Sequence, residues 1–564
     1  MNDLNLKPML NAYPDSMGGT LADIATVLEK PELRGAFASF YILPSLFNTD
    51  LDRGFSVIDY GLDRTLATRE DLERLQNLGI DLKLDFILNH ASVLSAPFQD
   101  ILKKGEDSEY KDFFINWNKF WEGHGEMTPE GYIQPHAELI RDMFFRKPGL
   151  PILMVRMPDG KDVPYWNTFY QEVRYSHVDA LDLVGKTGMQ YSVAKILEQR
   201  INEGLDAGKK PAEIDLTEAG EYRAAVIDLL ESGRKYLGQM DLNIKSPKVW
   251  EHYDNTLKTL ASYGARIVRL DAFAYAPKEP GSRNFLNEPG TWDLLEQVRQ
   301  LADKYGVTLL PEIHASYGEK THELVASKGY MIYDFFLPGL LIHTLESKDS
   351  TLLSGWAQEL LDKKMWAVNM LGCHDGIPML DLKGMLPGEQ IQNLIDTIVA
   401  RGGYIKNLHG QKNMYYQVNA TYFSALGEDE KKMLMARAIQ LFMPGKPQIW
   451  YLDLFGGKND HEAVRRAGPG GHKEINRSNL SMDRINEEIN GSLFRDQVEL
   501  LRMRSGCDAF RTDADIRISA PNAHALDITW THGNSRAALH ADLSDLSFTV
   551  ETTRDGDVTF RMER

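Results

Sequence analysis

Short apolar runs alternate with longer amphipathic segments along most of the chain. The stretch TREDLERLQNLGIDLKLDFILNH shows one such unit. Thr68 can cap a helix that has Asp71 in its first turn, and Leu72, Leu75 and Leu78 form its apolar face. The following run, LKLDFILNH, has the composition and length of a buried strand. The unit therefore predicts a helix followed by a strand.

Eight segments of this strand type occur, and most of them precede a helical pattern. They are 8–13, 35–43, 82–90, 266–273, 306–314, 329–336, 365–375 and 447–455. Eight strands that alternate with helices favour an α/β fold, the (β/α)8 or TIM barrel.

Two connections are too long for simple loops, so we expect inserted subdomains after strands 3 and 7. Helices are predicted at 191–206 and 217–237 within the first connection. Short β-like runs after residue 510 predict a small C-terminal β domain. The expected division is barrel (1–91, 266–375, 428–508), inserted domain B (92–265, with an extra helical insertion at 173–238), inserted domain B′ (376–427) and C-terminal β domain (509–564).

Composition narrows the class of protein. The 564 residues are 43% hydrophobic and carry a formal net charge of −18, which argues against nucleic acid or anionic membranes as partners. Only two cysteines occur, so neither a disulfide framework nor a cysteine-based zinc site is predicted. The N-terminal stretch MNDLNLKPML does not resemble a signal peptide, and no run is apolar enough to cross a membrane. We expect a cytoplasmic protein.

Polar residues follow several predicted strands at their carboxyl ends, where barrel enzymes place their catalytic groups. Three carboxylates at one barrel mouth suit glycosidic bond chemistry, in which one attacks the anomeric carbon and a second donates a proton. Neighbouring strands, about 4.8 Å apart, can bring two of them to the spacing of a retaining pair. The residues are Asn89, His90, Arg269, Asp271, Glu312, His314, His374 and Asp375, with Asp52 in the loop after strand 2.

The neighbours of two carboxylates predict their protonation. Arg269 lies two residues from Asp271 and should keep it ionised. The apolar approach to Glu312, with carboxylates nearby, should raise its pKa and suit a general acid.

At these residues the chain resembles a known family. DFILNH, RIVRLD, LPEIH and CHD are similar, in order, to the four short motifs of the α-amylase family, glycoside hydrolase family 13. DRGFSVIDY, RLDAFAY, PEIHASY, HDGI, TYFSALG and EINR resemble its sucrose phosphorylase subfamily, over about residues 8–510. The resemblance implies a retaining glucoside phosphorylase, which passes glucose to inorganic phosphate by double displacement and yields α-D-glucose 1-phosphate. It implies no cofactor and no metal site.

The resemblance also implies residue roles. Asp271 matches the nucleophile, Glu312 the general acid/base and Asp375 the carboxylate that stabilises the transition state. The glucose-holding side is matched by Asp52, Phe55, His90, Arg269, His374 and Arg477. The acceptor side is matched by Tyr275, His314 and Gln417, with Met414, Tyr415 and Tyr416 in the same loop.

Two loops depart from the subfamily pattern. In MFFRKPGLP, Lys147 takes the place of the phosphate-binding arginine and Arg146 that of a proline. In HGQKNMYYQVN, Met414 replaces the aspartate expected to contact fructose, and Lys412 adds a charge. Met414 and bulky Tyr415 would narrow the acceptor site, which favours 2-O-α-D-glucosylglycerol as substrate.

Other readings stay open. Arg146 and Lys412 would suit sucrose 6′-phosphate or glucosylglycerate, and sucrose itself is a further alternative. A family 13 hydrolase or transglucosidase, or a catalytically inactive carbohydrate-binding protein, is the more distant rival. A homodimer is possible. The helical insertion at 173–238 is an inert surface feature, a lid or an oligomer interface.

Overall fold

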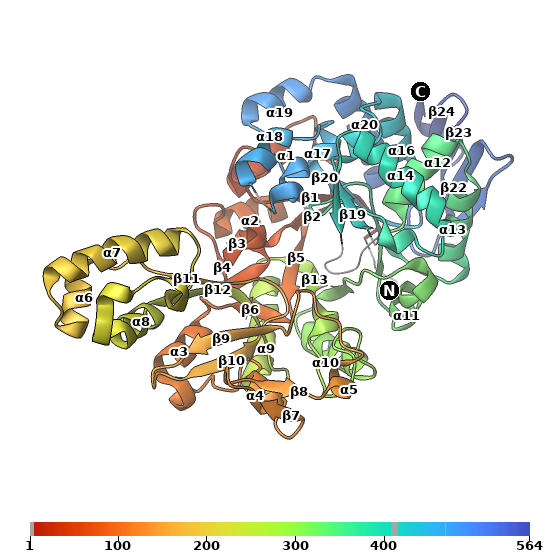
Figure 1. Cartoon of the computed structure of the whole chain (residues 1–564). Coiled ribbons are helices and arrows are strands. Elements are labelled where there is room, and N and C mark those ends of the chain that lie inside the picture. The colour runs from red at the N-terminus through yellow and green to blue at the C-terminus, as the bar shows by residue number, and fades with distance from the viewer. Residues whose placement is uncertain (1–4, 408–414, 469) are drawn as a thin grey trace.

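The computed structural model describes residues 5–407, 415–468 and 470–564 (Figure 1). Its centre is one sheet of eight parallel strands, β1 (Met9–Ala12), β2 (Ser39–Ile42), β5 (Asp81–Ile87), β13 (Ala265–Asp271), β14 (Thr308–Pro311), β15 (Ile332–Asp334), β16 (Ala367–Met370) and β20 (Gly445–Trp450). They are hydrogen-bonded in the order β14-β13-β5-β2-β1-β20-β16-β15. The two end strands are consecutive along the chain, so the sheet curls into a nearly closed barrel. The predicted (β/α)8 fold and its eight strands are confirmed.

Helices cover the outside of the barrel. Thr68 caps the predicted helix as expected, because its Oγ1 accepts from the Asp71 amide and the Asp71 carboxylate accepts from the Thr68 amide. Leu72 and Leu75 of that helix are buried against the strands. The barrel helices are α1 (Leu21–Leu28), α2 (Arg69–Asn77), α9 (Pro247–Ser262), α10 (Gly290–Asp303), α11 (Thr321–Ser327), α12 (Leu337–Ser347), α13 (Thr351–Asp362), α16 (Glu430–Phe442) and α20 (Ser492–Gly506).

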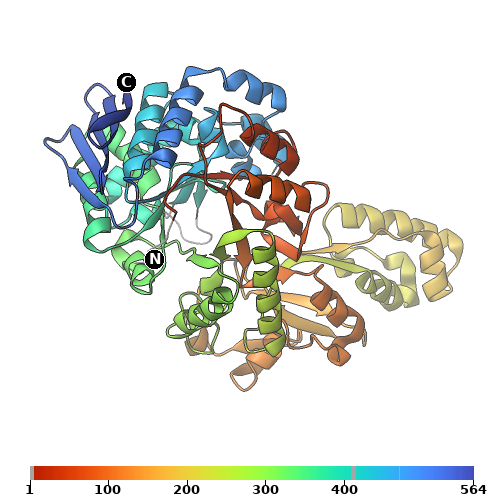
Figure 2. The ribbon, with the colours of Figure 1, turned by 180° about the vertical axis from the view of Figure 1, so that it is seen from behind.

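The long connection from β5 to β13 forms a subdomain beside the barrel mouth. Its strands are β6 (His90–Ser92), β7 (Gly125–Met127), β8 (Ile133–Pro135), β9 (Ile152–Arg156), β10 (Asp162–Trp166), β11 (Gln171–Tyr175) and β12 (Arg234–Asp241). Its helices are α3 (Ala96–Lys104), α4 (Trp117–Phe120), α5 (Ala137–Ile140), α6 (Ala180–Thr187), α7 (Tyr191–Asp206) and α8 (Arg223–Ser232). Figures 1 and 2 show α6, α7 and α8 as an arm that projects from the body.

The arm has a small hydrophobic core of its own, which includes Leu183, Leu197, Ile201 and Val226. It is carried by the antiparallel ribbon of β11 and β12. The helix predicted at 191–206 is confirmed as α7.

The helix predicted at 217–237 is wrong at both ends. Only α8 is an α-helix there, because the backbone of Gly220 has a φ of +52° and interrupts the helical run before it. From Arg234 onward the chain is β12. This strand leads from the arm back to the barrel and pairs with β11 and β6. Sheet pairing therefore overrides a helical pattern at these residues.

The connection from β16 to α16 forms the second inserted segment. It contains β17 (Ile377–Pro378), the 3₁₀ turn η8 (Leu380–Leu382), α14 (Gly388–Ala400), β18 (Tyr404–Asn407), β19 (Tyr415–Asn419) and α15 (Tyr422–Ala425). β19 pairs with both β17 and β18. After β20 come α17 (Tyr451–Leu454), α18 (His461–Ala467), the 3₁₀ turn η9 (Gly471–Asn476) and α19 (Met482–Glu488).

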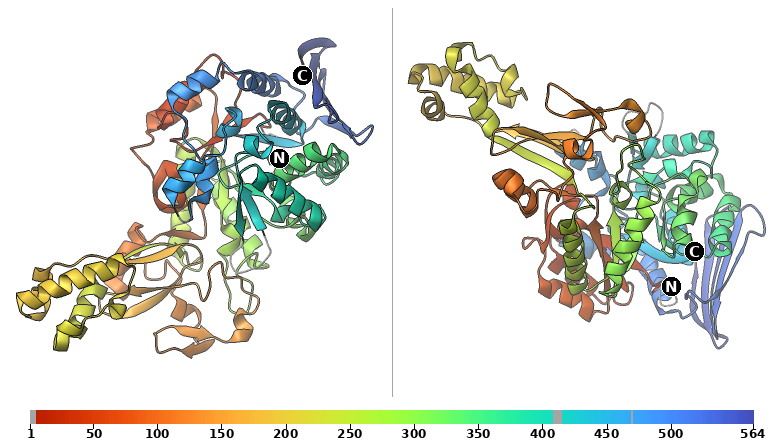
Figure 3. Two further views of the ribbon diagram at one scale, coloured as in Figure 1. Left: turned by 45° about the horizontal axis from the view of Figure 1, so that its top comes forward. Right: turned by 90° about the horizontal axis from the view of Figure 1, so that it is seen from below.

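The C-terminal strands form an antiparallel sheet at the edge of the molecule (Figure 3). They are β21 (Asp515–Ser519), β22 (Ala525–His532), β23 (Ser535–Asp542), β24 (Ser547–Arg554) and β25 (Asp557–Glu563), which confirms the predicted β domain. Buried Trp530 ties the sheet to the barrel, since its Nε1 donates to the Phe442 carbonyl at 2.8 Å. Within the described ranges, no helix combines the length and the apolarity needed to cross a membrane.

Candidate active site

The three predicted catalytic carboxylates open into one cavity of about 480 Å³ at the carboxyl ends of the strands. Asp271 ends β13, Glu312 follows β14 and Asp375 lies beyond β16. Leu270 pairs with Pro311, so Asp271 and Glu312 follow at the same level on neighbouring strands. The structure thus brings the three together, as their positions at strand ends predicted. Their catalytic roles remain predictions.

The chain turns sharply directly after Asp271. Ala272 has a φ of +52°, in the left-handed region that few residues other than glycine adopt. The turn starts the short 3₁₀ helix η6 (Phe273–Tyr275) at once, and Tyr275 as well as Asp271 lines the cavity. Backbone strain of this kind is concentrated at functional sites.

Arg269 connects the carboxylates at the floor of the cavity. Its side chain is 3% exposed, and its guanidinium lies 3.1 Å from Asp271 Oδ1 and 2.6 Å from Glu312 Oε1. It also forms an ion pair with buried Asp85, which accepts from the Tyr41 hydroxyl at 2.8 Å. One buried cation is therefore held by three carboxylates, which fixes the position of each.

The pKa shifts of the two central carboxylates have directions opposite to those predicted from the sequence. Burial, opposed by Arg269 and reinforced by Glu312, raises the pKa of Asp271 well above its ordinary value. Burial would also raise the pKa of Glu312, but Arg269 and His314, whose Nε2 lies 3.6 Å from Glu312 Oε1, outweigh it and lower that pKa. Along the sequence Arg269 stands beside Asp271 only, but in the folded chain it lies closer to Glu312.

Stacked rings lie among the residues predicted from the motifs to hold glucose. Phe55 stacks on His374 with centroids 5.1 Å apart, and His90 Nε2 donates to the Phe55 carbonyl at 3.0 Å. Gly54 before Phe55 has a φ of +118°, and a Cβ there would meet the Ser45 amide at 2.2 Å. Glycine is thus required where this loop packs on the barrel. The side chain of Asp52 lies outside what the structure describes.

Asp375 is held by cations from the segment after β20. Lys473 Nζ lies 2.6 Å from Asp375 Oδ1, and Arg477 lies 4.0 Å from the same oxygen. Arg477 is 3% exposed and its Nε donates to the His374 carbonyl at 2.7 Å. Sequence reasoning identified Arg477 but missed Lys473, although it stands four residues earlier in HKEINR.

Arg146 and aromatic residues surround Tyr275, which was predicted for the acceptor side. Arg146 donates to the Tyr275 hydroxyl at 3.0 Å and lies over the Phe169 ring at 5.1 Å. Phe144 and Phe285 also line the cavity, and Phe285 packs on the Tyr275 ring. The structure thus places a guanidinium at this wall, next to apolar surface.

The other acceptor-side predictions have varied outcomes. Lys147 hydrogen-bonds Asn167 and is not among the residues that line the cavity, so its phosphate-binding role stays a prediction. Gln417 is buried in β19, also away from the lining. Met414, together with Lys412, lies outside the described residues, as do the side chains of Tyr415 and Tyr416.

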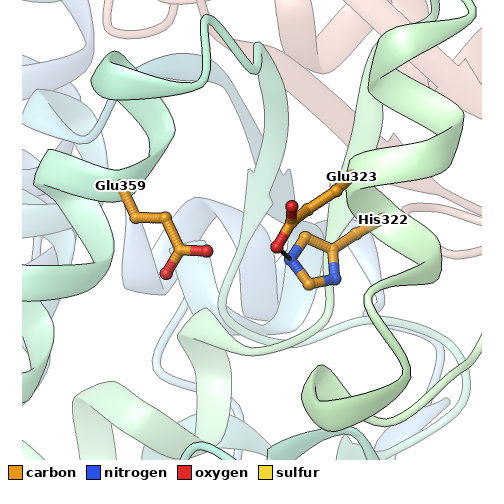
Figure 4. Close-up of side chains that lie close together, drawn as sticks. All are labelled: His322, Glu323 and Glu359. Atoms are coloured by element: carbon orange, nitrogen blue, oxygen red, sulfur yellow. Dashed lines mark ion pairs between the residues drawn. The ribbon is translucent and has the colours of Figure 1, made fainter.

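A group with metal-ligand chemistry lies between α11 and α13 (Figure 4). Its members are His322, Glu323 and Glu359. Lys363 Nζ lies 2.7 Å from a carboxylate oxygen of each glutamate, and Lys320 lies 3.3 Å from Glu323. Lysine ammonium groups therefore already balance both carboxylates.

A lysine likewise fills an oxygen-lined position next to the active site. Lys278 Nζ lies 2.8 Å from Asp241 Oδ2, 3.0 Å from Asn89 Oδ1 and 2.6 Å from the Tyr275 carbonyl. Both charged side chains are almost completely buried, at 1% and 0% exposure. This pair ties β12, the end of β5 and the loop after β13 together.

Comparisons with known proteins agree with this arrangement. The sucrose 6(F)-phosphate phosphorylase of Ilumatobacter coccineus is 47% identical, over 97% of this chain and 96% of its own length. The glucosylglycerol phosphorylase of Marinobacter adhaerens is 29% identical, over 95% and 94%. The crystal structure of sucrose 6F-phosphate phosphorylase from Thermoanaerobacter thermosaccharolyticum superposes with a TM-score of 0.80 at 30% identity, covering 99% and 98% of the two chains. No protein-family model matches the chain.

Proposed function

Because the chain belongs to the sucrose phosphorylase subfamily of glycoside hydrolase family 13, we propose that its donor substrate is sucrose 6F-phosphate. Its phosphorylase relatives make it a glucoside phosphorylase, a hexosyltransferase that uses an α-glucoside and inorganic phosphate. In the proposed reaction, the glucosyl unit passes to phosphate, and α-D-glucose 1-phosphate and fructose 6-phosphate are released.

The observation that carries the choice of donor is the position of Arg146. Its guanidinium lines the cavity, where the Tyr275 hydroxyl and the Phe169 ring hold it. A planar guanidinium binds phosphate oxygens in pairs, which gives both affinity and orientation. An acceptor wall with an arginine favours a phosphorylated aglycone over a neutral one.

Further basic side chains line the same cavity. His314 and Lys383 also line the cavity, and Lys383 is exposed at its rim. Three basic side chains, Arg146, Lys383 and His314, therefore line the cavity that would receive a phosphate ester on the aglycone. The earlier expectation of glucosylglycerol depended on Met414, which lies outside the described residues.

The proposed chemistry uses the three carboxylates in sequence. Asp271 attacks the anomeric carbon while Glu312 protonates the leaving fructose oxygen, and phosphate then attacks the glucosyl-enzyme with Glu312 as base. Glu312 must carry a proton before the first step. A glycosidic oxygen that accepts a hydrogen bond from Glu312 favours that form, because only the protonated acid can donate. Asp375 stabilises the positive charge that develops on the sugar ring. Arg269 balances the negative charges of the carboxylates around that ring.

The test compares sucrose 6F-phosphate with sucrose in the wild type and in Arg146→Ala. We expect the wild type to prefer the phosphorylated donor, and the variant to lose about 10- to 100-fold in kcat/KM for it, since a charge-assisted hydrogen bond contributes about 1.5–3 kcal/mol. The kcat/KM for sucrose should change much less in this variant. Arg141→Ala removes an exposed arginine that pairs with Asp142 and serves as the control. A wild type that prefers sucrose or glucosylglycerol would refute the assignment of the donor and leave the phosphorylase class intact.

A further inference from the structure

The imidazole of His314 lies between two carboxylates, one at each ring nitrogen. Nε2 is 3.6 Å from Glu312 Oε1, and Nδ1 is 3.4 Å from Asp381 Oδ1. The ring stacks on Phe335 with centroids 3.8 Å apart and an interplanar angle of 20°. Both distances exceed those of a normal hydrogen bond, so each carboxylate acts on the ring through its charge, which favours the imidazolium.

Asp381 belongs to η8 in the second inserted segment and is 2% exposed. Neither of its carboxylate oxygens forms a hydrogen bond of normal geometry within the part of the chain that the structure describes. Its ion pair with His314 is therefore the contact that balances its charge. A buried carboxylate without such a partner is costly, so the charge on Asp381 and the charge on His314 stabilise each other.

Other charged groups around the ring do not cancel this effect. Glu312 is itself paired with Arg269. Glu319 and Lys383 also line the cavity, and their charges are opposite to each other. Burial lowers the pKa of His314, but Asp381 and then Glu312 outweigh burial and raise it to about 10. The imidazolium is therefore the form present at neutral pH.

We propose that Asp381 is a positioning residue that holds His314 as an imidazolium, so that the cavity presents a fixed positive charge to incoming phosphate beside Glu312. Phosphate attacks the glucosyl group where the aglycone has left, and Glu312 and His314 line the same cavity. Attraction to the imidazolium would offset the repulsion between phosphate and the ionised Glu312. This inference rests on the proposed function only in its phosphate-dependent step and not on the identity of the aglycone.

The test uses α-D-glucosyl fluoride as donor, because its leaving group carries no phosphate. The KM for phosphate is measured in the wild type and in Asp381→Asn at several pH values, and the ratio of the two enzymes cancels the titration of phosphate itself. At pH about 8 we expect the variant to show a KM for phosphate raised roughly 10-fold, with kcat and the donor KM changed less than about threefold. Below pH about 6 the ratio should fall toward one, because solution protons then charge the imidazole without help from Asp381.

Two further variants separate positioning from a loss of structure. Asp381→Glu should restore much of the phosphate affinity at pH about 8, since it returns the carboxylate. Asp334→Asn removes another buried carboxylate. Asp334 accepts hydrogen bonds from the Trp356 ring and the Leu337 amide and does not contact an imidazole. The ratio of this variant's phosphate KM to that of the wild type should therefore not change with pH.

The outcomes are distinguishable. If Asp381→Asn behaves like Asp334→Asn, or loses activity equally at every pH and also in fluoride hydrolysis, the inference is wrong and the phosphorylase stands. If the wild type releases only free glucose from the fluoride donor in phosphate, the proposed function fails, and the inference fails with it.

Discussion

Lys473 holds Asp375 through an ion pair of 2.6 Å, with both side chains about one-fifth exposed at the cavity wall. This contact links the segment after β20 to the third carboxylate of the active site. The HKEINR segment therefore makes two contacts with the active site. Lys473 pairs with Asp375, and Arg477 donates a hydrogen bond to the His374 carbonyl.

Replacing Lys473 by Met should lower kcat/KM for the donor about 10-fold, because Asp375 loses the nearer of the two cations that hold it. Lys473→Arg should keep most of the activity. Lys458→Met, which removes an exposed lysine paired with Glu428, is the matched control and should behave as wild type. Steady-state kinetics with donor and phosphate varied separately measure the effect. An unchanged kcat/KM in Lys473→Met would mean that the ion pair is only a surface contact.

Lys278→Met should destabilise the protein by about 3–5 kcal/mol, since Asp241 would be left as a buried, unpaired charge. Denaturant unfolding measures the change. Adding Asp241→Asn to that variant should recover part of the loss because the unpaired charge disappears. Lys245→Met, at an exposed pair with Glu279, should cost little. A small loss in Lys278→Met would show that water reaches Asp241 in the folded protein.

The contribution of His314 to the free energy of unfolding should fall as pH rises. Its pKa is raised to about 10, so its contribution to stability is fully present below its ordinary pKa of about 6.5 and is lost as pH rises toward 10. His314→Gln should therefore lower the free energy of unfolding more at pH about 6 than at pH about 10. Denaturant melts at both pH values test this, with His540→Gln on the C-terminal sheet as control. An equal loss at both pH values would contradict the charged state assigned to the ring.

The helical arm should be dispensable for catalysis. None of the residues that line the cavity comes from α6, α7 or α8 within the described chain. Tyr175 and Arg234 pair at the end of the ribbon, so a two-residue Asn-Gly turn can replace residues 176–233. We expect kcat/KM within about threefold of the wild type in that deletion. A large loss of activity would identify the arm as a lid, and a change of oligomeric state in size-exclusion chromatography would identify it as an interface.

The barrel and its carboxylates could be predicted because both depend on local patterns. Apolar strands followed by helices specify the fold, and Asp271, Glu312 and Asp375 stand where those strands end. Contacts between distant segments could not be predicted in the same way. Lys473 reaches Asp375 from the segment after β20, and Asp381 reaches His314 from the second inserted segment, so both contacts form only when the chain is folded.

The same reason explains the errors. The protonation of Asp271 and Glu312 depends on which carboxylate Arg269 and His314 approach more closely, and the sequence shows only neighbours along the chain. The helix predicted through residue 237 had to give way to β12 because the arm is anchored by a ribbon. Local propensity predicts an element, and tertiary pairing decides its ends.

Proton NMR of the reaction products in phosphate buffer tests the central claim most directly. Sucrose 6F-phosphate, sucrose and glucosylglycerol are compared side by side, with Asp271→Asn as the inactive control. The account predicts rapid formation of α-D-glucose 1-phosphate and fructose 6-phosphate from sucrose 6F-phosphate, slower reaction of the other donors, and no product from the variant. Release of free glucose in place of glucose 1-phosphate, or a β-configured product, would contradict it.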